Sequence, residues 1–276
     1  METSQAVLVT GCSSGIGRAT ALALVRAGLP TWASARDTAT LADLEAEGCR
    51  TLRLDVTDED SRIEAVRAVE AEHGAVGALV NNAGYAQVGP VEEVPLEALR
   101  RQFETNVFGL VRLCQLVLPG MRAQHGGTIV NLGSGAGLVT PPASGAYAMT
   151  KYALESLTDA LRLETRAFGI RVALLEPGAV RTGFVSTLTA GAPHGELPGP
   201  YDTLMRNAIA LAERDGNSGR SLAPEDVAKA VVHAVTSRRP RTRYRIGSQA
   251  RLAPPARRAM GDRLWDRLLE RVCPTQ

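Results

Sequence analysis

Residues 10–17 read Thr-Gly-Cys-Ser-Ser-Gly-Ile-Gly, and this stretch decides the fold. An apolar run at Ala6–Thr10, predicted to form a strand, leads into it, and a segment with a helical pattern follows at Ile16–Ala27. Glycines at such a junction let the backbone approach a pyrophosphate, and the amides of the helix N-terminus attract its charge. The spacing G-x-x-x-G-x-G departs from the G-x-G-x-x-G dinucleotide fingerprint, so a plain glycine turn is the alternative. The strand-then-helix context favours dinucleotide binding.

The same alternation continues along the chain. Short apolar runs predict strands at Ala6–Thr10, Thr31–Ala35, Thr51–Asp55, Ala78–Asn81, Thr128–Leu132, Arg171–Leu175 and near Tyr244–Ile246. Helical patterns are found at Ile16–Ala27, Thr38–Gly48, Glu59–His73, Leu96–Met121, Ala146–Phe168, Thr203–Glu213, Pro224–Thr236 and Arg263–Arg271. Alternation of this kind produces βαβ units and a parallel sheet covered on both faces. We therefore expect an α/β fold with a single doubly wound, Rossmann-like parallel sheet of about seven strands.

Length and composition limit the class of protein. The 276 residues are 45% hydrophobic and 22% charged, which excludes disorder and predicts one globular domain over residues 1–276. A net charge of +2 and an aromatic content of 4% favour neither nucleic acid nor an anionic membrane as a partner. The alternation breaks after Pro177, and the Gly- and Pro-rich residues 183–223 predict a substrate lid.

Cysteine and histidine positions predict neither a metal site nor a disulfide framework. The four cysteines show no C-x-x-C spacing, and the four histidines form no H-E-x-x-H cluster. The N-terminus is short and polar, without the pattern of a signal peptide. The charge-free stretch Gly126–Thr150 is too rich in Gly, Ser, Thr and Pro to be a membrane span. We expect a cytoplasmic protein without a bound metal.

Tyr147 and Lys151 are the first candidates for catalytic residues. They stand four residues apart in a predicted helix, so the phenol and the ammonium group share one face. A nearby positive charge lowers the pKa of a tyrosine, which would make Tyr147 a proton donor or acceptor near neutral pH. The alternative is a chance pair on an amphipathic helix. Lysine occurs only at 151 and 229, against 29 arginines, and the two residue types are not interchangeable.

Ser134 is a third candidate, because it follows the strand predicted at Thr128–Leu132. In a doubly wound sheet, ligands bind beyond the carboxyl ends of the strands. The glycine loop and the turn Asn81-Asn82-Ala83-Gly84 should gather at the same edge. A serine in a Gly-rich turn is often only a turn former, and Ser144 stands closer to Tyr147 in the sequence. The residues alone leave both serines open.

Together, these motifs resemble the short-chain dehydrogenase/reductase family, closely over residues 6–182 and loosely beyond. Residues 10–17 are similar to its T-G-x-x-x-G-I-G cofactor loop, and residues 81–84 to its N-N-A-G turn. Ser134 and residues 147–151 match its catalytic Ser and Y-x-x-x-K, and residues 177–182 match its P-G-x-x-x-T segment. Gly133, where many members carry a second serine, is a minor departure. The resemblance, nearest to the steroid- and retinol-dehydrogenase side, implies hydride transfer between a nicotinamide and a carbonyl or alcohol carbon.

The resemblance also implies a role for single residues. Ser134 rather than Ser144 would hydrogen-bond the substrate oxygen, and Tyr147 would pass the proton. Lys151 would hold the nicotinamide ribose and depress the pKa of Tyr147, and Asn106 would support a water that relays protons to Lys151. The implied catalytic set is Asn106, Ser134, Tyr147 and Lys151. The implied cofactor-binding set is Gly11, Ser13, Ser14, Gly15, Ile16, Gly17, Arg36, Asp55, Val56, Asn82, Ala83, Gly84, Tyr147, Lys151, Pro177, Gly178, Val180 and Thr182.

The residues after the second predicted strand bear on the choice of cofactor. An acid at this place binds the ribose 2′-hydroxyl of NAD, whereas an arginine accommodates the 2′-phosphate of NADP. Both Arg36 and Asp37 are present, but Arg36 comes first. Within the family, this order together with Ser13 resembles the NADP-preferring kind, so we expect NADP. The alternative is that both charges are only solvated loop residues.

The sequence gives the least information about the substrate and the oligomeric state. The candidate pocket residues, mostly apolar, are Tyr85, Leu138, Val139, Pro142, Phe184 and Leu188. They favour a lipophilic ketone or secondary alcohol. An epimerase or isomerase that recycles NADP, or a cofactor-sensing regulator, are the alternatives. The family's usual helix contacts predict a homodimer or homotetramer, and the leucines at 110, 113, 116 and 118 suggest a second apolar face on one of those helices.

Overall fold

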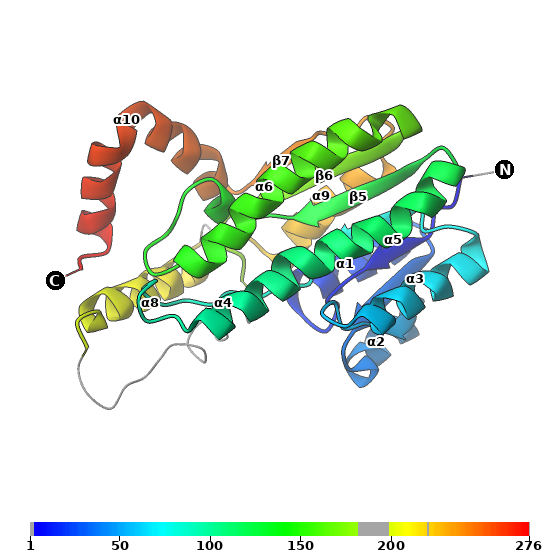
Figure 1. Ribbon diagram of the computed structural model, residues 1–276, viewed down its shortest axis with the longest axis horizontal. Helices are drawn as coiled ribbons and strands as arrows, with labels where there is room; N and C mark the ends of the chain where they lie inside the picture. Colours follow the sequence, from blue (N-terminus) through cyan, green and yellow to red (C-terminus); the bar gives the residue numbers. More distant parts are fainter. Residues whose placement is uncertain (1–2, 182–198, 220, 276) are drawn as a thin grey trace.

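A computed structural model describes residues 3–181, 199–219 and 221–275 of the chain. Seven parallel strands form one sheet in the order β3-β2-β1-β4-β5-β6-β7 (Figure 1). Their bounds are β1 (Val7–Val9), β2 (Thr31–Ala35), β3 (Arg50–Arg53), β4 (Ala78–Asn81), β5 (Gly127–Leu132), β6 (Ile170–Pro177) and β7 (Arg243–Ile246). The chain begins in the middle of the sheet and winds outward in both directions, which confirms the predicted doubly wound fold.

Different helices cover the two faces of the sheet. On one face lie α1 (Gly15–Arg26), α2 (Ala42–Ala46) and α9 (Pro224–Thr236), and on the other α3 (Glu59–His73), α5 (Gly109–Ala123) and α6 (Gly145–Thr165). Successive residues of a strand point to opposite faces, so Val7 and Val9 join the first core layer and Leu8 joins the second. A strand buried on both faces therefore shows a continuous apolar run, the pattern that the sequence displays.

Three helices gather beyond the end of the sheet: α4 (Leu96–Phe103), α8 (Asp202–Asn217) and α10 (Ser248–Val272) (Figure 1). The second half of α10 packs on α8, where Asn207 Nδ2 donates to Pro274 O at 2.8 Å and Cys273 is buried. Short helical turns complete the chain at η1 (Thr38–Leu41), η2 (Glu104–Phe108), η3 (Gly135–Gly137) and η4 (Arg166–Phe168). These helices place residues from distant parts of the sequence above the strand ends.

Two predicted helices differ in the structure. The helix predicted at Leu96–Met121 consists of α4, the π-helical turn η2 and α5. The terminal helix begins much earlier than the predicted Arg263, and Gly261, with φ 69°, separates its two halves. Prolines at 254 and 255 lie inside the first half. Because proline disfavours a helix interior, the sequence pattern concealed that half.

The leucines of α5 do not form the second apolar face that their number suggested. Leu110 and Leu113 are buried in the core layer beneath α5, and Leu116 and Leu118 pack against that layer. Packing within one subunit therefore accounts for all four. On η2, α6 and η4, the large apolar side chains that stay exposed are Phe108, Met149, Tyr152, Leu163 and Phe168.

Candidate active site

A cavity of about 1160 Å³ lies at the carboxyl ends of the strands. The glycine loop, the turn after β4, the end of β5, α6 and the end of β6 all contribute to its lining. Strand order reverses between β1 and β4, the place where doubly wound sheets bind their ligands. The fold thus brings the predicted motifs, separated by more than a hundred residues, to one cavity.

The glycine loop is shaped for close backbone packing. Gly11 has φ +71° and Gly15 has φ +57°, a conformation that favours glycine. A β-carbon on Gly17 would lie 2.3 Å from Gly11 O, so the loop and the start of α1 fit only without that atom. Ser14, the N-cap of α1, makes no side-chain cap hydrogen bond. The first amides of α1 are therefore available at the cavity wall, and this end of the cavity fits a pyrophosphate.

The turn after β4 fastens the loop in place. Thr10 Oγ1 accepts hydrogen bonds from Asn82 N and Ala83 N, both at 2.9 Å. Asn82 Nδ2 donates to Thr10 O at 2.8 Å and to Gly11 O at 3.1 Å. Asn82, Ala83 and Gly84 line the cavity beside the loop. The paired motifs are thus one hydrogen-bonded unit rather than two separate turns.

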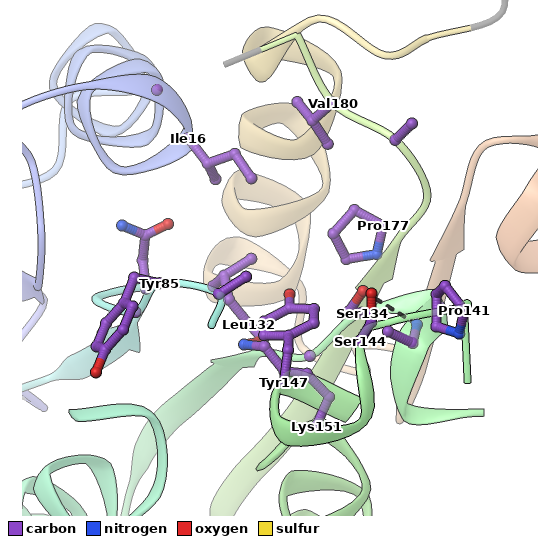
Figure 2. A pocket seen from close by; sticks show the side chains of 18 of the residues that line it. Ile16, Tyr85, Leu132, Ser134, Pro141, Ser144, Tyr147, Lys151, Pro177 and Val180 are labelled. Carbon is purple, nitrogen blue, oxygen red and sulfur yellow. Dashed lines mark hydrogen bonds between the residues drawn. The ribbon is translucent and has the colours of Figure 1, made fainter. Parts of the chain in front are cut away.

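Ser134, Tyr147 and Lys151 lie together on one wall (Figure 2). The side chain of Ser134 hydrogen-bonds Tyr147, whereas Ser144 Oγ donates to Pro142 O within its own turn at 3.2 Å. Lys151 is 8% exposed, and its Nζ donates to Leu132 O at 2.7 Å. That Nζ lies 5.6 Å from the centre of the Tyr147 ring. This arrangement favours Ser134 over Ser144 as the partner of the tyrosine.

The direction of the tyrosine pKa differs from the expectation. Burial raises the pKa of Tyr147 to about 12, and the hydrogen bond from Ser134 lowers it by less. Burial also lowers the pKa of Lys151 to about 8, because a charged ammonium loses its hydration. Burial, rather than the charge of Lys151, therefore dominates the pKa of Tyr147. The sequence places the two residues on one face, but it does not show how deeply both are buried.

Asn106 lies behind the wall of the cavity, and its expected role toward a relay water and Lys151 stays a prediction. It lies in η2, is 2% exposed, and its Nδ2 donates to Tyr85 O at 2.8 Å and to Thr150 Oγ1 at 3.1 Å. Its Oδ1 accepts from Tyr85 N at 3.1 Å. Thr150 Oγ1 in turn donates to Tyr147 O at 2.7 Å. The side chain therefore joins the loop after β4 to the catalytic turn of α6, and it is absent from the cavity lining.

The loop after β2 carries both residues that could select the cofactor, Arg36 and Asp37, and only Arg36 lines the cavity. Arg36 is exposed and lines the cavity, and its charge helps to lower the pKa of Asp55. For that carboxyl, burial raises the pKa, but hydrogen bonds from Thr57 and the charges of Arg36 and Arg53 outweigh the effect. Asp37 Oδ1 instead accepts from Ala39 N at 3.0 Å as the N-cap of η1. Asp55 and Val56 line the cavity, and Asp37 does not.

The remaining predicted residues divide into three groups. Pro177, Gly178 and Val180 line the cavity after β6, and so do Tyr85, Val139 and Pro142. Leu138 lies outside the lining, and Gly17 packs behind it. Thr182, Phe184 and Leu188 lie outside the described residues, as do residues 183–198 and 220 of the predicted lid.

The predicted lid, residues 183–223, includes α8, but the sequence analysis missed the wall that α10 contributes. Ala208, Leu211 and Ala212 of α8 line the cavity, and so do Trp265 and Leu269 of α10. The apolar spacing at 264, 265, 268, 269 and 272 was the available signal, since it repeats every three or four residues. It identifies an amphipathic helix but gives no hint of what the helix covers.

Comparison with known proteins identifies the family. A sequence model described as "short chain dehydrogenase" matches residues 5–192. The chain belongs to the short-chain dehydrogenase family. It is an NAD(P)-dependent oxidoreductase of that family. It is 33% identical to the Escherichia coli oxidoreductase YbbO over 96% of this chain and 94% of the other. Human retinol dehydrogenase 8 is 36% identical over 85% of this chain and 78% of its own length.

Solved structures agree with this assignment. A short-chain dehydrogenase from Streptomyces avermitilis superposes with a TM-score of 0.80 at 34% identity, covering 97% of this chain and 98% of the other. A serine dehydrogenase complexed with NADP⁺ and a Burkholderia phymatum short-chain dehydrogenase/reductase complexed with NAD both give TM-scores of 0.77 at 28% identity. The first covers 88% of this chain and 94% of its own, and the second 94% and 93%. Members of similar shape thus bind either cofactor. Among the helices that the structure describes, none is long and apolar enough to cross a membrane.

Proposed function

We propose that this dehydrogenase uses NADP to interconvert a carbonyl and a secondary alcohol on a lipophilic small molecule. The observation that carries the proposal is the convergence of Ser134, Tyr147 and Lys151 with the glycine loop on one cavity. The cofactor and the class of substrate rest on separate features of that cavity, and each has its own test.

The preference for NADP rests on the loop after β2. The carboxylate of Asp37 caps η1. Arg36 instead lines the cavity and forms no salt bridge with any other described residue. A guanidinium can pair with a phosphate through two parallel hydrogen bonds, which gives both energy and specificity. This supports Arg36 as the group that reads the 2′-phosphate, with Ser13 and Ser14 beside it in the cavity lining.

The catalytic chemistry follows from the three side chains. When bound, the nicotinamide dinucleotide supplies or accepts the hydride. Ser134 orients the reacting oxygen, and Tyr147 donates a proton to it during reduction or accepts one during oxidation. Lys151, as an ammonium, favours the phenolate that reduction leaves behind. Asn106 holds Thr150 and Tyr85, and through them the position of the tyrosine.

A lipophilic substrate is supported by the wall that α8 and α10 contribute. Leu211, Trp265 and Leu269 present apolar surface to the cavity. The one charged side chain that these helices place there, among the described residues, is the carboxylate of Asp215, which disfavours an anionic substrate. Retinol dehydrogenase 8, a relative covering most of the chain, is named for a lipophilic alcohol.

The exposed apolar side chains on η2 and α6 support a homodimer or homotetramer. Phe108 is 53% exposed and Leu163 is 69% exposed, and Met149 and Tyr152 lie on the same helix as Leu163. Burying such residues against a second copy would remove apolar surface from water. Light scattering at micromolar concentration should therefore give at least twice the mass of one chain, and a monomer would contradict this assembly.

The function is tested with a panel of lipophilic and hydrophilic ketones and alcohols, each with NADPH or NADP⁺ and with NADH or NAD⁺. We expect the near-ultraviolet absorbance of the reduced cofactor to change fastest with the NADP pair and a lipophilic compound. Product formation at constant absorbance would instead indicate an epimerase or isomerase that recycles its cofactor. Cofactor binding without turnover of any compound would favour a regulator.

A further inference from the structure

The wall that α8 and α10 contribute to the cavity contains one polar pair. Asp215, in the last turn of α8, and Gln249, in the first turn of α10, both line the cavity. The other residues that these two helices place in the lining are glycine, alanine, leucine and tryptophan. A carboxylate among such residues loses part of its hydration, so it requires a partner.

Hydrogen bonds hold the pair in one orientation. Gln249 Oε1 accepts from Ala179 N at 3.1 Å, and Gln249 Nε2 donates to Asp215 Oδ2 at 2.8 Å. A main-chain N–H can only donate, so the oxygen of the Gln249 amide must face Ala179 and its nitrogen must face the carboxylate. Asp215 Oδ1 accepts no hydrogen bond from any residue that the structure describes. One oxygen of the carboxylate is therefore fixed, and the other is available to a ligand.

The charge of Asp215 is not balanced by a neighbouring cation. Asp43, Asp159 and Asp226 each pair with an arginine or a lysine. In the part of the chain that the structure describes, Asp215 has no such ion pair, although the residue is half-buried. Half-buried carboxylates are stabilised by an opposite charge within hydrogen-bond distance. A positively charged ligand in the cavity would supply that charge.

The pair lies close to the segments that carry the reaction. The main-chain hydrogen bond of Gln249 joins it to the segment after β6. The next residue, Ala250, packs on the turn of Ser134, because a β-carbon on Gly135 would lie 3.7 Å from Ala250 Cα. Asp215 is the next side chain beyond Gln249. A substrate held at Ser134 by its reacting oxygen therefore shares the cavity with this carboxylate.

We propose that Asp215 is a specificity-determining residue, which binds the ammonium group of a lipophilic amino ketone or amino alcohol. Its Oδ1 accepts hydrogen bonds from the ammonium, while Gln249 holds Oδ2 and keeps the carboxylate directed at the ligand. The apolar residues of α8 and α10 contact the hydrocarbon part of the same molecule. The reaction of this substrate rests on the proposed function, whereas the binding of an alkylammonium does not.

An ammonium fits this site better than other polar groups do. It carries both a positive charge and N–H donors, so it satisfies the charge and the available oxygen together. A hydroxyl group would satisfy only the oxygen, and an anion would be repelled. Among the described residues, no group of three His, Cys, Asp or Glu side chains could hold a metal ion, so a single carboxylate is a poor site for one.

Binding is tested first, with compounds that cannot react. Octylammonium, octanol and octyl sulfate are titrated into the free protein by calorimetry, at concentrations too low for micelles. Octylammonium should bind roughly 10- to 100-fold more tightly than octanol, as expected for a charge-assisted hydrogen bond, and octyl sulfate more weakly than either. Raising the ionic strength should reduce the preference for octylammonium. Equal affinities for octylammonium and octanol would overturn the proposal.

Variants of α8 locate the preference. Asp215→Asn keeps an oxygen that can accept from Gln249 Nε2 but removes the charge, so its affinity for octylammonium should fall to that for octanol. Ala212→Lys keeps Asp215 and adds an ammonium one helix turn away, which should also abolish the preference. Glu213→Gln, exposed on the same helix and outside the cavity lining, is the matched control and should keep it. An unchanged preference in Asp215→Asn or in Ala212→Lys would overturn the role of the carboxylate.

Turnover is then measured with two long-chain ketones that differ only in an amine or a methyl group next to the carbonyl. The wild type should show a kcat/KM at least 10-fold higher for the amino ketone, and Asp215→Asn should lose this difference while keeping its rate with the methyl analogue. Equal kcat/KM for both ketones in the wild type would overturn the specificity role and leave the proposed function intact. If neither ketone is turned over, the proposed function fails, and the octylammonium titrations still decide whether Asp215 binds a cation.

Discussion

The cavity has two walls that the chain builds in different ways. The wall of the glycine loop and the turn after β4 is held by short hydrogen bonds among Thr10, Gly11 and Asn82, and even one added carbon at Gly17 would not fit. The wall formed by α8 and α10 consists mainly of apolar side chains on helices that pack against each other away from the sheet. A site for one particular ligand requires particular residue types, whereas an apolar wall can be built from many different apolar residues. The first wall should therefore define the cofactor, and the second should vary with the substrate.

The largest expected effect is on the chemistry that both walls serve. Tyr147→Phe removes the hydroxyl that exchanges the proton and should lower kcat by about 10²–10⁴-fold. Affinity for NADPH, measured by fluorescence titration, should stay nearly unchanged. Tyr152→Phe, an exposed tyrosine on the same helix, is the control and should keep full turnover. Turnover of Tyr147→Phe within a few-fold of the wild type would rule out the proton-transfer role.

A smaller effect is expected at the loop after β2, where Arg36 would bind the 2′-phosphate of NADPH. Arg36→Ala should weaken NADPH binding by roughly 10- to 100-fold, since hydrogen bonds to charged groups contribute about 1.5–3 kcal/mol. NADH binding should hardly change. Arg53→Ala removes another charge that acts on Asp55 but does not line the cavity, and it should leave both affinities unchanged. Equal losses for NADPH and NADH in Arg36→Ala would mean that Arg36 only supports the loop.

The tight packing of the cofactor wall predicts a loss of stability. Gly17→Ala places a carbon 2.3 Å from Gly11 O and should lower the free energy of unfolding by about 1–3 kcal/mol. Binding of NADPH should weaken as well, because the start of α1 must move. Gly219→Ala, where no atom lies within 4 Å of the added carbon, should be nearly neutral. Denaturant unfolding of both variants checks the difference, and equal stabilities would contradict it.

The smallest effect is expected on the apolar wall. Leu269→Ala removes three carbons from a side chain that is only partly buried at the cavity wall. It should raise KM for a lipophilic substrate by about 10-fold or less, because losing about half of three CH₂ contributions of about 0.8 kcal/mol amounts to about 1.2 kcal/mol. The dissociation constant of NADPH should not change. Leu264→Ala, 52% exposed on the same helix, is the matched control. A change in NADPH affinity for Leu269→Ala would show that the two walls are not independent.

The same contrast explains how much the sequence could predict. The sequence predicted the sheet, the order of its elements and the residues of the glycine loop and the turn after β4. Each of these depends on local patterns at fixed spacing. Even the role of Asp37 had a signal, since an acid before Thr38 and Ala39 is a good helix N-cap. The proline-interrupted first half of α10 had none, because its position depends on contacts with η3 and β7.

Burial and packing account for what the sequence could not show at the site. Spacing placed Tyr147 beside Lys151, but the pKa of the tyrosine depends on how much water the folded site excludes. Asn106 was recognised by its motif, yet its side chain is engaged with Tyr85 and Thr150, residues far from it in sequence. Such partners arise from the packing of η2 against α6, which no local pattern reveals.

The most direct test of the proposed function follows the hydride itself. NADPH that carries deuterium at the transferable position of its nicotinamide is incubated with a lipophilic ketone and the wild-type protein, and the products are analysed by mass spectrometry. We predict one deuterium on the carbinol carbon of the alcohol, formed faster than from labelled NADH and nearly absent with Tyr147→Phe. Product without the label, or faster transfer from NADH, would contradict an NADP-dependent oxidoreductase at this site.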